Sequence, residues 1–537
     1  MPRTVKPGPA TDNPRVSGYY VLGSGDDEMA SEGGTETSDA DDREAEFETF
    51  RKTIEQFKDL IVAAFDELHE LVSKKIATPH QYFSNHHDYP QQSTTSSGFP
   101  IFNETGFYAK EARKDYVGSI RPMGLLGMLM IGRDKELSPE LGKLVAFLDA
   151  DELGEHFRTS ETSEWEIEKL IDQAVESYFQ RFGTGPLDPL KRRKVLAPIV
   201  RSAFVNSFEL RIVIPIALTH FNVDRFRLSD TAYVTRIPKG VQLSRARMDL
   251  RGSGAGKNVV GAATHAFVSK NWNLEFETND EARRSMNNPS KNVLDEADIF
   301  FGALRAATGA RTGYAQVLMI PKGVAFEMYC DLPQFFGATY RRYPSDFDDY
   351  AWAYTGQSRV TAEQIKDVQR LYSLTLSRPE ERVRIALKRL NACMSRDDAV
   401  DAILDAMIGL EVLLGDSENQ ALSYKLRMRA GALATLKGNR TAAEVSAEMG
   451  RIYGIRSEIV HGLSSQGKKA KKKVAVPEEE RYAADRDAAA AMLRYILNIL
   501  LEHHRYLEPQ RIDRELLLGE ARPAERDTDE LDLFPTP

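Results

Sequence analysis

The spacing of hydrophobic residues predicts a largely helical N-terminal region. Apolar side chains recur every three or four positions between 50 and 72, which is the period of one helix face. These residues are Phe50, Ile54, Phe57, Ile61, Phe65, Leu68 and Val72. The stripe is short for a coiled coil, so we expect it to pack within its own domain. Helical spacing returns at 138–153 and 163–182.

The hydrophobic period changes to two in the middle of the chain, which indicates β-strands. Apolar and other residues alternate over 210–218 and 272–276, and 314–320 has the composition of a largely buried strand. A helix is predicted between them at 294–307. Because Pro215 has no amide N–H to donate, we expect the first strand at a sheet edge or with a bulge.

Helical periodicity dominates the C-terminal part of the chain. It occurs in six segments, 361–376, 379–393, 397–415, 420–436, 442–462 and 478–507. The breaks between them are short and contain Gly or Pro. Short connections make consecutive helices antiparallel neighbours, so these segments predict a helix bundle.

Together these patterns predict a multidomain α+β protein, because 537 residues exceed what one hydrophobic core usually holds. Residues 1–45 are acidic and polar and cannot bury enough apolar area to offset their chain entropy, so we expect them to be disordered. The predicted order is then a mainly helical region at 46–204, a mixed, mainly β module at 205–340, a junction at 341–360, an all-α bundle at 361–507 and a charged tail at 508–537 that frays.

Charge and cysteine content narrow the classes of function. The net charge is −9, so any contact with RNA must come from a local basic patch. The two cysteines, Cys330 and Cys393, lack metal-site spacing and fit a reducing compartment. No apolar run reaches transmembrane length and the N-terminus lacks a signal-peptide core, which predicts a cytoplasmic protein without a membrane partner.

Two further motifs carry possible chemistry. His86, His87 and Asp88 are potential metal ligands, but adjacent ligands without a second cluster favour a solvated loop. A glycine-rich stretch runs from Arg251 to Asn258. A phosphate-binding P-loop needs Gly at the first of these positions and Ser or Thr at the last. We therefore expect a flexible hairpin loop, whose basic residues could still meet an anion.

The strongest candidate chemistry lies between Tyr453 and Gly462. Gly462 favours a helix stop, which would place His461 in the last turn. A helix C-terminus favours a cationic imidazole, which suits His461 to proton transfer. Arg456 can bind a phosphate through two N–H groups and offset charge that develops in phosphoryl transfer. Such a pair suits attack of a ribose 2′-hydroxyl on its own phosphate, without a metal or cofactor. In many helices, however, an Arg and a His at this spacing only form surface ion pairs.

This motif, together with the upstream segment from Ala406 to Gly415, resembles the HEPN superfamily, and most closely the Apea-like HEPN group of bacterial anti-phage defence. The resemblance covers about 361–507. It implies RNA cleavage by Arg456 and His461, and a homodimer in which two motifs meet across a two-fold axis. Many active members have Asn, Asp or His after the Arg, where this chain has Ser457. Ser457 can share a hydrogen bond but supplies no charge, which favours weaker activity or RNA binding alone.

Two groups of residues are expected to support the motif. Glu411 lies on an otherwise apolar helix and needs a cationic partner to remain ionised, and the candidates are Arg427, Arg429 and Arg456. A basic run follows the motif directly and consists of Lys468, Lys469, Lys471, Lys472 and Lys473. The run is either a solvated loop or a contact for the RNA backbone.

The leading function is therefore a metal-independent endoribonuclease in a bacterial defence or stress-response system. The N-terminal and middle regions would sense a phage-derived or cellular trigger, or restrain the nuclease. Two alternatives remain: a catalytically inactive RNA-binding or regulatory module, and a structural helical adaptor that only dimerises. A solvent-open cleft shared by Arg456 and His461 would favour a function on RNA, whereas a buried His461 would favour the adaptor.

Overall fold

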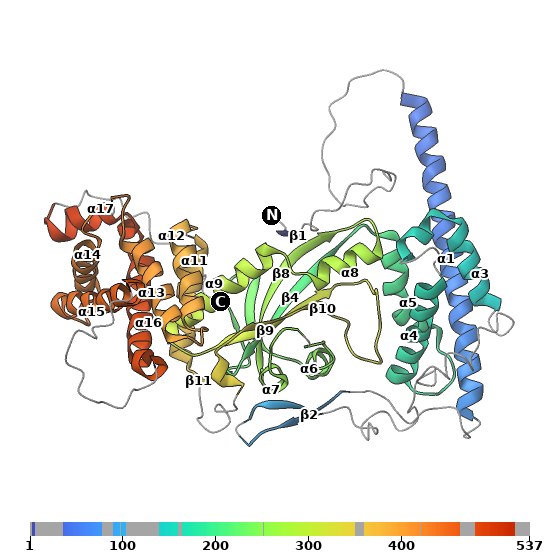
Figure 1. Ribbon diagram of the computed structural model, residues 1–537. Coiled ribbons are helices and arrows are strands. Elements are labelled where there is room, and N and C mark those ends of the chain that lie inside the picture. The colour runs from blue at the N-terminus through green and yellow to red at the C-terminus, as the bar shows by residue number, and fades with distance from the viewer. Residues whose placement is uncertain are drawn as a thin grey trace. The chain divides into compact units, whose positions relative to one another are not determined.

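A computed structural model describes residues 3–5, 36–77, 90–96, 98–103, 139–158, 164–250, 252–348, 359–377, 379–418, 420–461 and 478–520. The fold is a mixture of α-helices and β-strands, as predicted, and its C-terminal region is helical (Figure 1). The chain forms two compact units. The first comprises 1–216, 231–294 and 314–341, and the second comprises 217–230, 295–313 and 342–537. Each unit is therefore built from three segments that are separated along the chain. None of the described helices is long and apolar enough to cross a membrane.

Helices account for one part of the first unit. They are α1 (Glu36–Ala77), α3 (Pro139–Ala150), the 3-10 helix η1 (Glu152–Phe157), α4 (Glu164–Phe182) and α5 (Pro189–Phe204). The predicted stripe on α1 is confirmed, since Phe57, Ile61 and Phe65 are fully buried in the core that these helices share. Helix α1 begins at Glu36, however, inside the segment expected to be disordered. Its acidic first turns are compatible with a helix N-terminus, where negative charge is favoured.

A β-sheet forms another part of the first unit. Its strands are β1 (Arg3–Val5), β4 (Ser207–Ala217), β7 (Ala232–Arg236), β8 (His265–Glu275), β9 (Gly313–Pro321) and β10 (Phe336–Arg342). The spatial order is β10-β9-β4-β8-β7, and β1 pairs in parallel with β8. The strands predicted from alternation are thus confirmed. Strand β1 also lies in the segment that was expected to be disordered, so this expectation is wrong there too. The strand pairs through main-chain groups, which needs no hydrophobic pattern.

The expected edge position of the Pro215 strand is wrong. Strand β4 lies between β9 and β8, and Pro215 is paired with Ala266. A register shift does occur, but between Leu210 and Ile212. Every residue from Ile212 to the end of β4 is buried, so burial of both faces outweighs the missing N–H at Pro215.

Short elements complete the first unit. They are the hairpin of β2 (Gln91–Thr94) and β3 (Pro100–Asn103), and the helices α6 (Lys239–Arg245), α7 (Lys257–Gly261) and α8 (Asn279–Asn287). Figure 1 shows α6 and α7 on one face of the sheet. The glycine-rich stretch joins these two helices, so the expected hairpin loop is wrong. The fully buried Arg245 anchors α7 by donating hydrogen bonds to the Val260 and Gly261 carbonyl oxygens.

The second unit contains the C-terminal helices in the predicted places. They are α11 (Ala362–Ser377), α12 (Glu381–Cys393), α13 (Ala399–Leu414), α14 (Leu422–Lys437), α15 (Ala442–His461) and α16 (Glu478–Glu502). Most of α9 (Lys291–Thr308), the strands β5 (His220–Phe221), β6 (Arg225–Arg227) and β11 (Arg359–Val360), and the 3-10 helix η2 (Ser345–Phe347) also belong to this unit. Helix α13 packs against α12, α14, α15 and α16, which makes it the centre of the helical region.

The segment after residue 508 is ordered as far as 520, contrary to the fraying expected for the tail. The 3-10 helix η3 (His504–Leu507), helix α17 (Pro509–Arg511) and the π-helix η4 (Ile512–Leu517) follow α16. Ile512 is fully buried, and η4 packs against α14. The buried Pro509 and Ile512, and the ion pairs of Asp513 with Arg429 and of Glu515 with Arg505, hold this segment. None of these residues belongs to a periodic hydrophobic pattern in the sequence.

Candidate functional site

The Arg-His motif occupies the last turns of α15. The start of this helix is fixed by a capping box, in which Thr441 Oγ1 accepts from the Glu444 N–H and Glu444 Oε2 accepts from the Thr441 N–H. The helix is continuous through Arg456 and Ser457 to His461. The motif therefore lies on a regular helix surface and not on a loop.

Arg456 is held by residues on two sides. Its Nε lies 3.4 Å from Glu411 Oε1 on α13, and the two side chains are 28% and 22% exposed. Its Cζ lies 5.9 Å from the ring centroid of Tyr453, on the preceding turn of α15. Within the described part of the chain, Arg456 donates no hydrogen bond. Its remaining N–H groups can therefore bind an anion while Glu411 and Tyr453 hold the guanidinium in place.

His461 is exposed at the described end of α15. It forms no hydrogen bond or ion pair with any residue that the structure describes. Ser457 is half-buried and lies one helical turn below it. This arrangement leaves the imidazole accessible to a bound molecule, and it contradicts the buried His461 expected for a purely structural adaptor.

Of the three arginines considered as partners for Glu411, the structure brings only Arg456 to it. Arg427 is exposed on α14 and its side chain lies against Gly450 of α15. Arg429 is only 2% exposed, but it points to a different cluster. The residue spacing along α14 could not distinguish these outcomes, because they depend on how α13, α14 and α15 pack.

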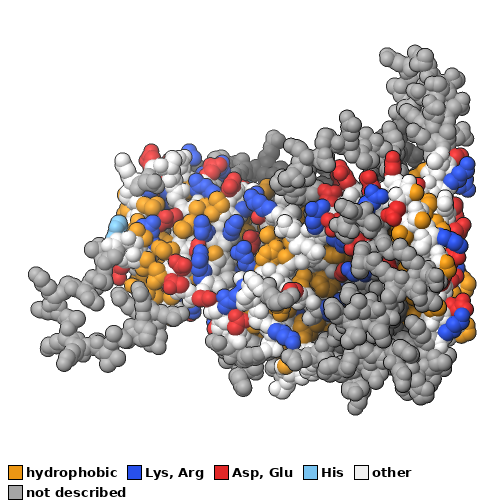
Figure 2. Space-filling view, turned by 45° about the vertical axis from the view of Figure 1, so that its right-hand side comes forward, with side chains coloured by type: hydrophobic (Ala, Val, Ile, Leu, Met, Phe, Trp, Pro, Cys, Tyr) orange, Lys and Arg blue, Asp and Glu red, His pale blue; other side chains and the backbone are white. Residues whose placement is uncertain are grey.

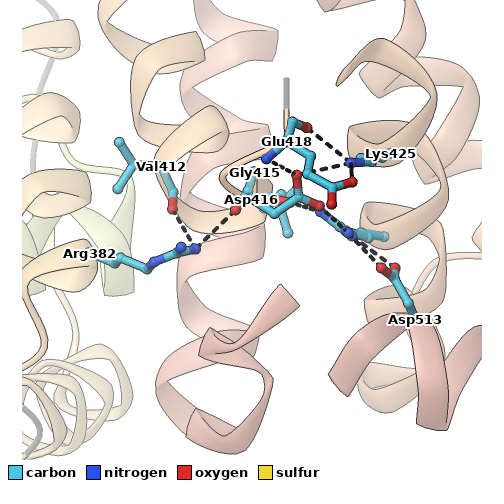
Figure 3. Close-up of polar contacts among 9 residues, drawn as sticks. Arg382, Val412, Gly415, Asp416, Glu418, Lys425 and Asp513 are labelled. Carbon is cyan, nitrogen blue, oxygen red and sulfur yellow. Dashed lines mark hydrogen bonds and ion pairs between the residues drawn. The ribbon is translucent and has the colours of Figure 1, made fainter. Parts of the chain in front are cut away.

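Arg429 organises a polar cluster at the C-terminal end of α13. It donates to Leu414 O at 2.7 Å, to Asp416 Oδ2 at 2.7 Å and to both carboxylate oxygens of Asp513 at 2.8 and 2.5 Å. Lys425 adds a contact of 2.9 Å to Asp416 Oδ1 (Figure 3). The Arg429 guanidinium, above all, lowers the pKa of Asp416 to about 2. The cluster thus keeps its charges paired.

The same cluster fixes the end of the helix that carries Glu411. Arg382 donates to Val412 O at 3.2 Å and to Gly415 O at 3.0 Å (Figure 3). The Gly415 N–H donates to Glu411 O at 2.7 Å. A side chain at Gly415 would collide with that carbonyl oxygen, so glycine is required there. These contacts satisfy carbonyl groups that a helix end normally leaves without partners, and they hold the turn containing Glu411 rigid.

The basic run of Lys468, Lys469, Lys471, Lys472 and Lys473 lies outside the described residues. On the face seen in Figure 2, Lys and Arg side chains over the C-terminal helices alternate with acidic and hydrophobic ones. That face therefore provides no uniform electrostatic attraction for a polyanion.

The other candidates from the sequence do not form a site. His86, His87 and Asp88 lie outside the described residues, and the described ranges contain no group of three or more potential metal ligands. Cys330 and Cys393 are both buried. Burial raises the pKa of the Cys393 thiol to about 12 and raises that of Cys330 still further, so neither is a ready nucleophile.

No protein family, curated protein or solved structure that was compared with this chain matches it.

Proposed function

We propose that the second unit is a metal-independent endoribonuclease of the HEPN type. The observation that supports this most is the position of the Arg456 guanidinium. Glu411 and Tyr453 hold it, and its remaining N–H groups have no partner among the described residues. The exposed His461 lies five residues further along the same helix. In cleavage by the ribose 2′-hydroxyl, a fixed cation can stabilise the charge on the phosphate and an accessible imidazole can transfer a proton.

The proposed reaction is a transesterification within the RNA. His461 removes the proton from the 2′-hydroxyl, and its oxygen forms a new bond to the neighbouring phosphorus. The bond between phosphorus and the 5′-oxygen breaks, and this oxygen takes up a proton from the imidazolium of a second His461, which a second copy of the chain supplies. Arg456 binds the phosphate oxygens and stabilises their negative charge in the transition state. The products are a 2′,3′-cyclic phosphate and a 5′-hydroxyl.

Purified protein is expected to cleave labelled RNA in the presence of EDTA and to leave a 2′,3′-cyclic phosphate. RNA with a 2′-O-methyl group at the cut position should resist, because the nucleophile is blocked. Product ends mapped by mass spectrometry test both points. A metal requirement, or cleavage of the methylated RNA, would rule out this mechanism.

We also propose that the unit forms a homodimer around this site. Ile408 is 37% exposed on α13, one turn before Glu411, and Val460 is 52% exposed on α15, one turn after Arg456. Exposed apolar side chains on both sides of a polar pair are typical of an interface. A second copy would supply a second imidazole, so that one His461 acts as base and the other as acid.

Ile408→Glu is expected to convert a dimer to a monomer and to reduce cleavage with it, because the carboxylate would be desolvated at the interface. Leu190→Glu is the matched control, since Leu190 is 71% exposed on α5 in the first unit. Light scattering at micromolar concentration measures the mass of each variant. A wild-type monomer that still cleaves RNA would contradict the dimer.

The biological setting rests on the resemblance alone. In it, the enzyme acts in bacterial anti-phage defence or a stress response, and the first unit senses a phage-derived or cellular trigger. A catalytically inactive RNA-binding module is a second candidate, because Ser457 stands where many active members of the family carry Asn, Asp or His. In both cases the basic run at 468–473 would contact the phosphate backbone.

A further inference from the structure

A pocket of about 670 Å³ opens in the first unit, beside the outermost strand β10. The proposed nuclease function does not use it. Its lining includes Arg247, Arg283, Asn287, Glu327, Phe335 and Gly337. The glycine-rich stretch, which the sequence excludes as a P-loop, contributes Gly252 and Ser253 to the same lining. The volume lies in the range of small-molecule sites.

The backbone at one side of the pocket is built around Gly337. Its φ is +141°, and a Cβ at this position would collide with the carbonyl oxygen of Val317 on β9. Only glycine therefore allows β10 to begin so close to its neighbour. The Gly337 N–H donates to Asn287 Oδ1 at 3.1 Å, which orients the amide and leaves its NH₂ group as a donor.

Arg247 is a pre-oriented cation in this pocket. Its Cζ lies 3.2 Å from the centroid of the Tyr329 ring, so the guanidinium stacks on the ring. Its guanidinium interacts electrostatically with Glu176, whose pKa burial raises to about 7, but it donates no hydrogen bond to any described residue. Arg283, in the same lining, is instead bound to Glu166 at 2.7 Å. Arg247 is therefore the group able to bind an anion.

The pocket also contains an acceptor and an aromatic surface. Glu327 is partly buried, and within the described ranges its carboxylate has no hydrogen-bond or ion-pair partner. Phe335 is partly exposed and packs against the hydrophobic cluster that contains Val213 and Leu318. Asp249 adds a second carboxylate to the lining. Two carboxylates disfavour a simple polyanion and favour a ligand that carries N–H donors as well as an anionic group.

We propose that this pocket binds a purine nucleotide, with its phosphate on Arg247, its base over Phe335 and its base N–H groups on Glu327. Guanine presents two neighbouring N–H donors on one edge, which match the two oxygens of a carboxylate, whereas adenine presents only one amino group there. The pocket therefore prefers guanine to adenine. The site lies wholly within the first unit and is independent of the Arg456 chemistry.

Calorimetric titration of the full-length protein with GDP, ADP and inorganic phosphate tests this assignment. We expect GDP to bind most tightly and phosphate most weakly. Arg247→Gln should weaken GDP and ADP alike by about tenfold or more, because a charge-assisted phosphate contact is lost. Glu327→Gln should instead reduce the affinity for GDP to about that for ADP, since one oxygen of the carboxylate becomes a donor.

Two matched variants control for charge alone. Arg211→Gln on β4 and Glu275→Gln on β8 change exposed residues of the same unit outside the pocket, and both should leave GDP affinity unchanged. If either pocket variant fails to fold, hydrogen exchange of the wild-type protein with and without GDP takes its place. GDP is expected to slow amide exchange in 247–253 and 335–339. The assignment is overturned by no GDP binding at about 1 mM, by unchanged affinity in both pocket variants, or by protection confined to other segments.

Discussion

Replacing His461 with alanine is expected to lower the rate of RNA cleavage by about 10²–10⁴-fold while RNA still binds. The imidazole is exposed at the described end of α15 and has no partner among the described residues, so its removal disturbs little packing. Proton transfer is lost, but the phosphate contact of Arg456 remains. Single-turnover cleavage and a filter-binding assay on the same RNA separate these two effects.

Replacing Arg456 with alanine should reduce binding and rate together. Its guanidinium is proposed to hold the phosphate in the ground state and to stabilise added charge in the transition state, and loss of one such donor costs about 10²–10³-fold in rate. Arg451→Ala is the matched control, because Arg451 lies on the same helix and its exposed side chain forms an ion pair with Asp485. That variant should cleave RNA like the wild type.

Glu411→Gln tests whether the ion pair positions Arg456. The amide keeps the shape of the carboxylate but not its charge, so the guanidinium should be less well held. We expect a smaller loss of rate than in Arg456→Ala, with a nearly unchanged thermal melting curve.

Full activity of His461→Ala, or equal losses in Arg456→Ala and Arg451→Ala, would show that these residues do not carry the chemistry.

Local sequence patterns were sufficient for much of the fold. The stripe on α1, the alternation in β4 and β8, and the six C-terminal helical segments all come from residues close together in the chain, where the period of burial equals the period of the backbone. Pro215 shows the limit of a local rule. Its missing N–H favours an edge strand, yet burial on both faces of β4 places it in the middle of the sheet.

The features that sequence analysis missed depend on contacts between distant residues. Arg429 and Asp513 are 84 positions apart, and the second lies in a charged segment without hydrophobic periodicity. The same limit applies at the candidate site. The position of Glu411 on an apolar helix indicates that it needs a cation. Only the packing of α13 against α15 selects Arg456 over Arg427 and Arg429. The pocket beside β10 likewise joins Arg247 to Glu327 only in three dimensions.

Replacing Arg429 with alanine is expected to destabilise the second unit by about 3 kcal/mol at neutral pH. The change removes every hydrogen bond from Arg429 to Leu414, Asp416 and Asp513, and it leaves two carboxylates close together without their shared cation. Arg427→Ala, two positions earlier on the same helix, removes an exposed side chain and should cost less than about 0.5 kcal/mol. The pair of variants isolates the effect of the cluster from that of helix α14.

The stability difference between wild type and Arg429→Ala should shrink in acid. The pKa of Asp416 is about 2 in the folded protein, chiefly because of Arg429, and about 3.9 in an unfolded chain. A carboxylate whose pKa is lowered by folding contributes stability above about pH 4, and that contribution is lost as the pH falls towards 2. Hydrogen exchange of the α13 and α14 amides in urea, at pH 7 and near pH 3, reports on this unit directly. The wild type loses the Asp416 contribution on acidification and the variant has little of it to lose, so the unfolding free energies of the two proteins should converge. A difference that is constant with pH, or a loss of stability no larger than that of Arg427→Ala, would show that Arg429 does not stabilise the unit through Asp416.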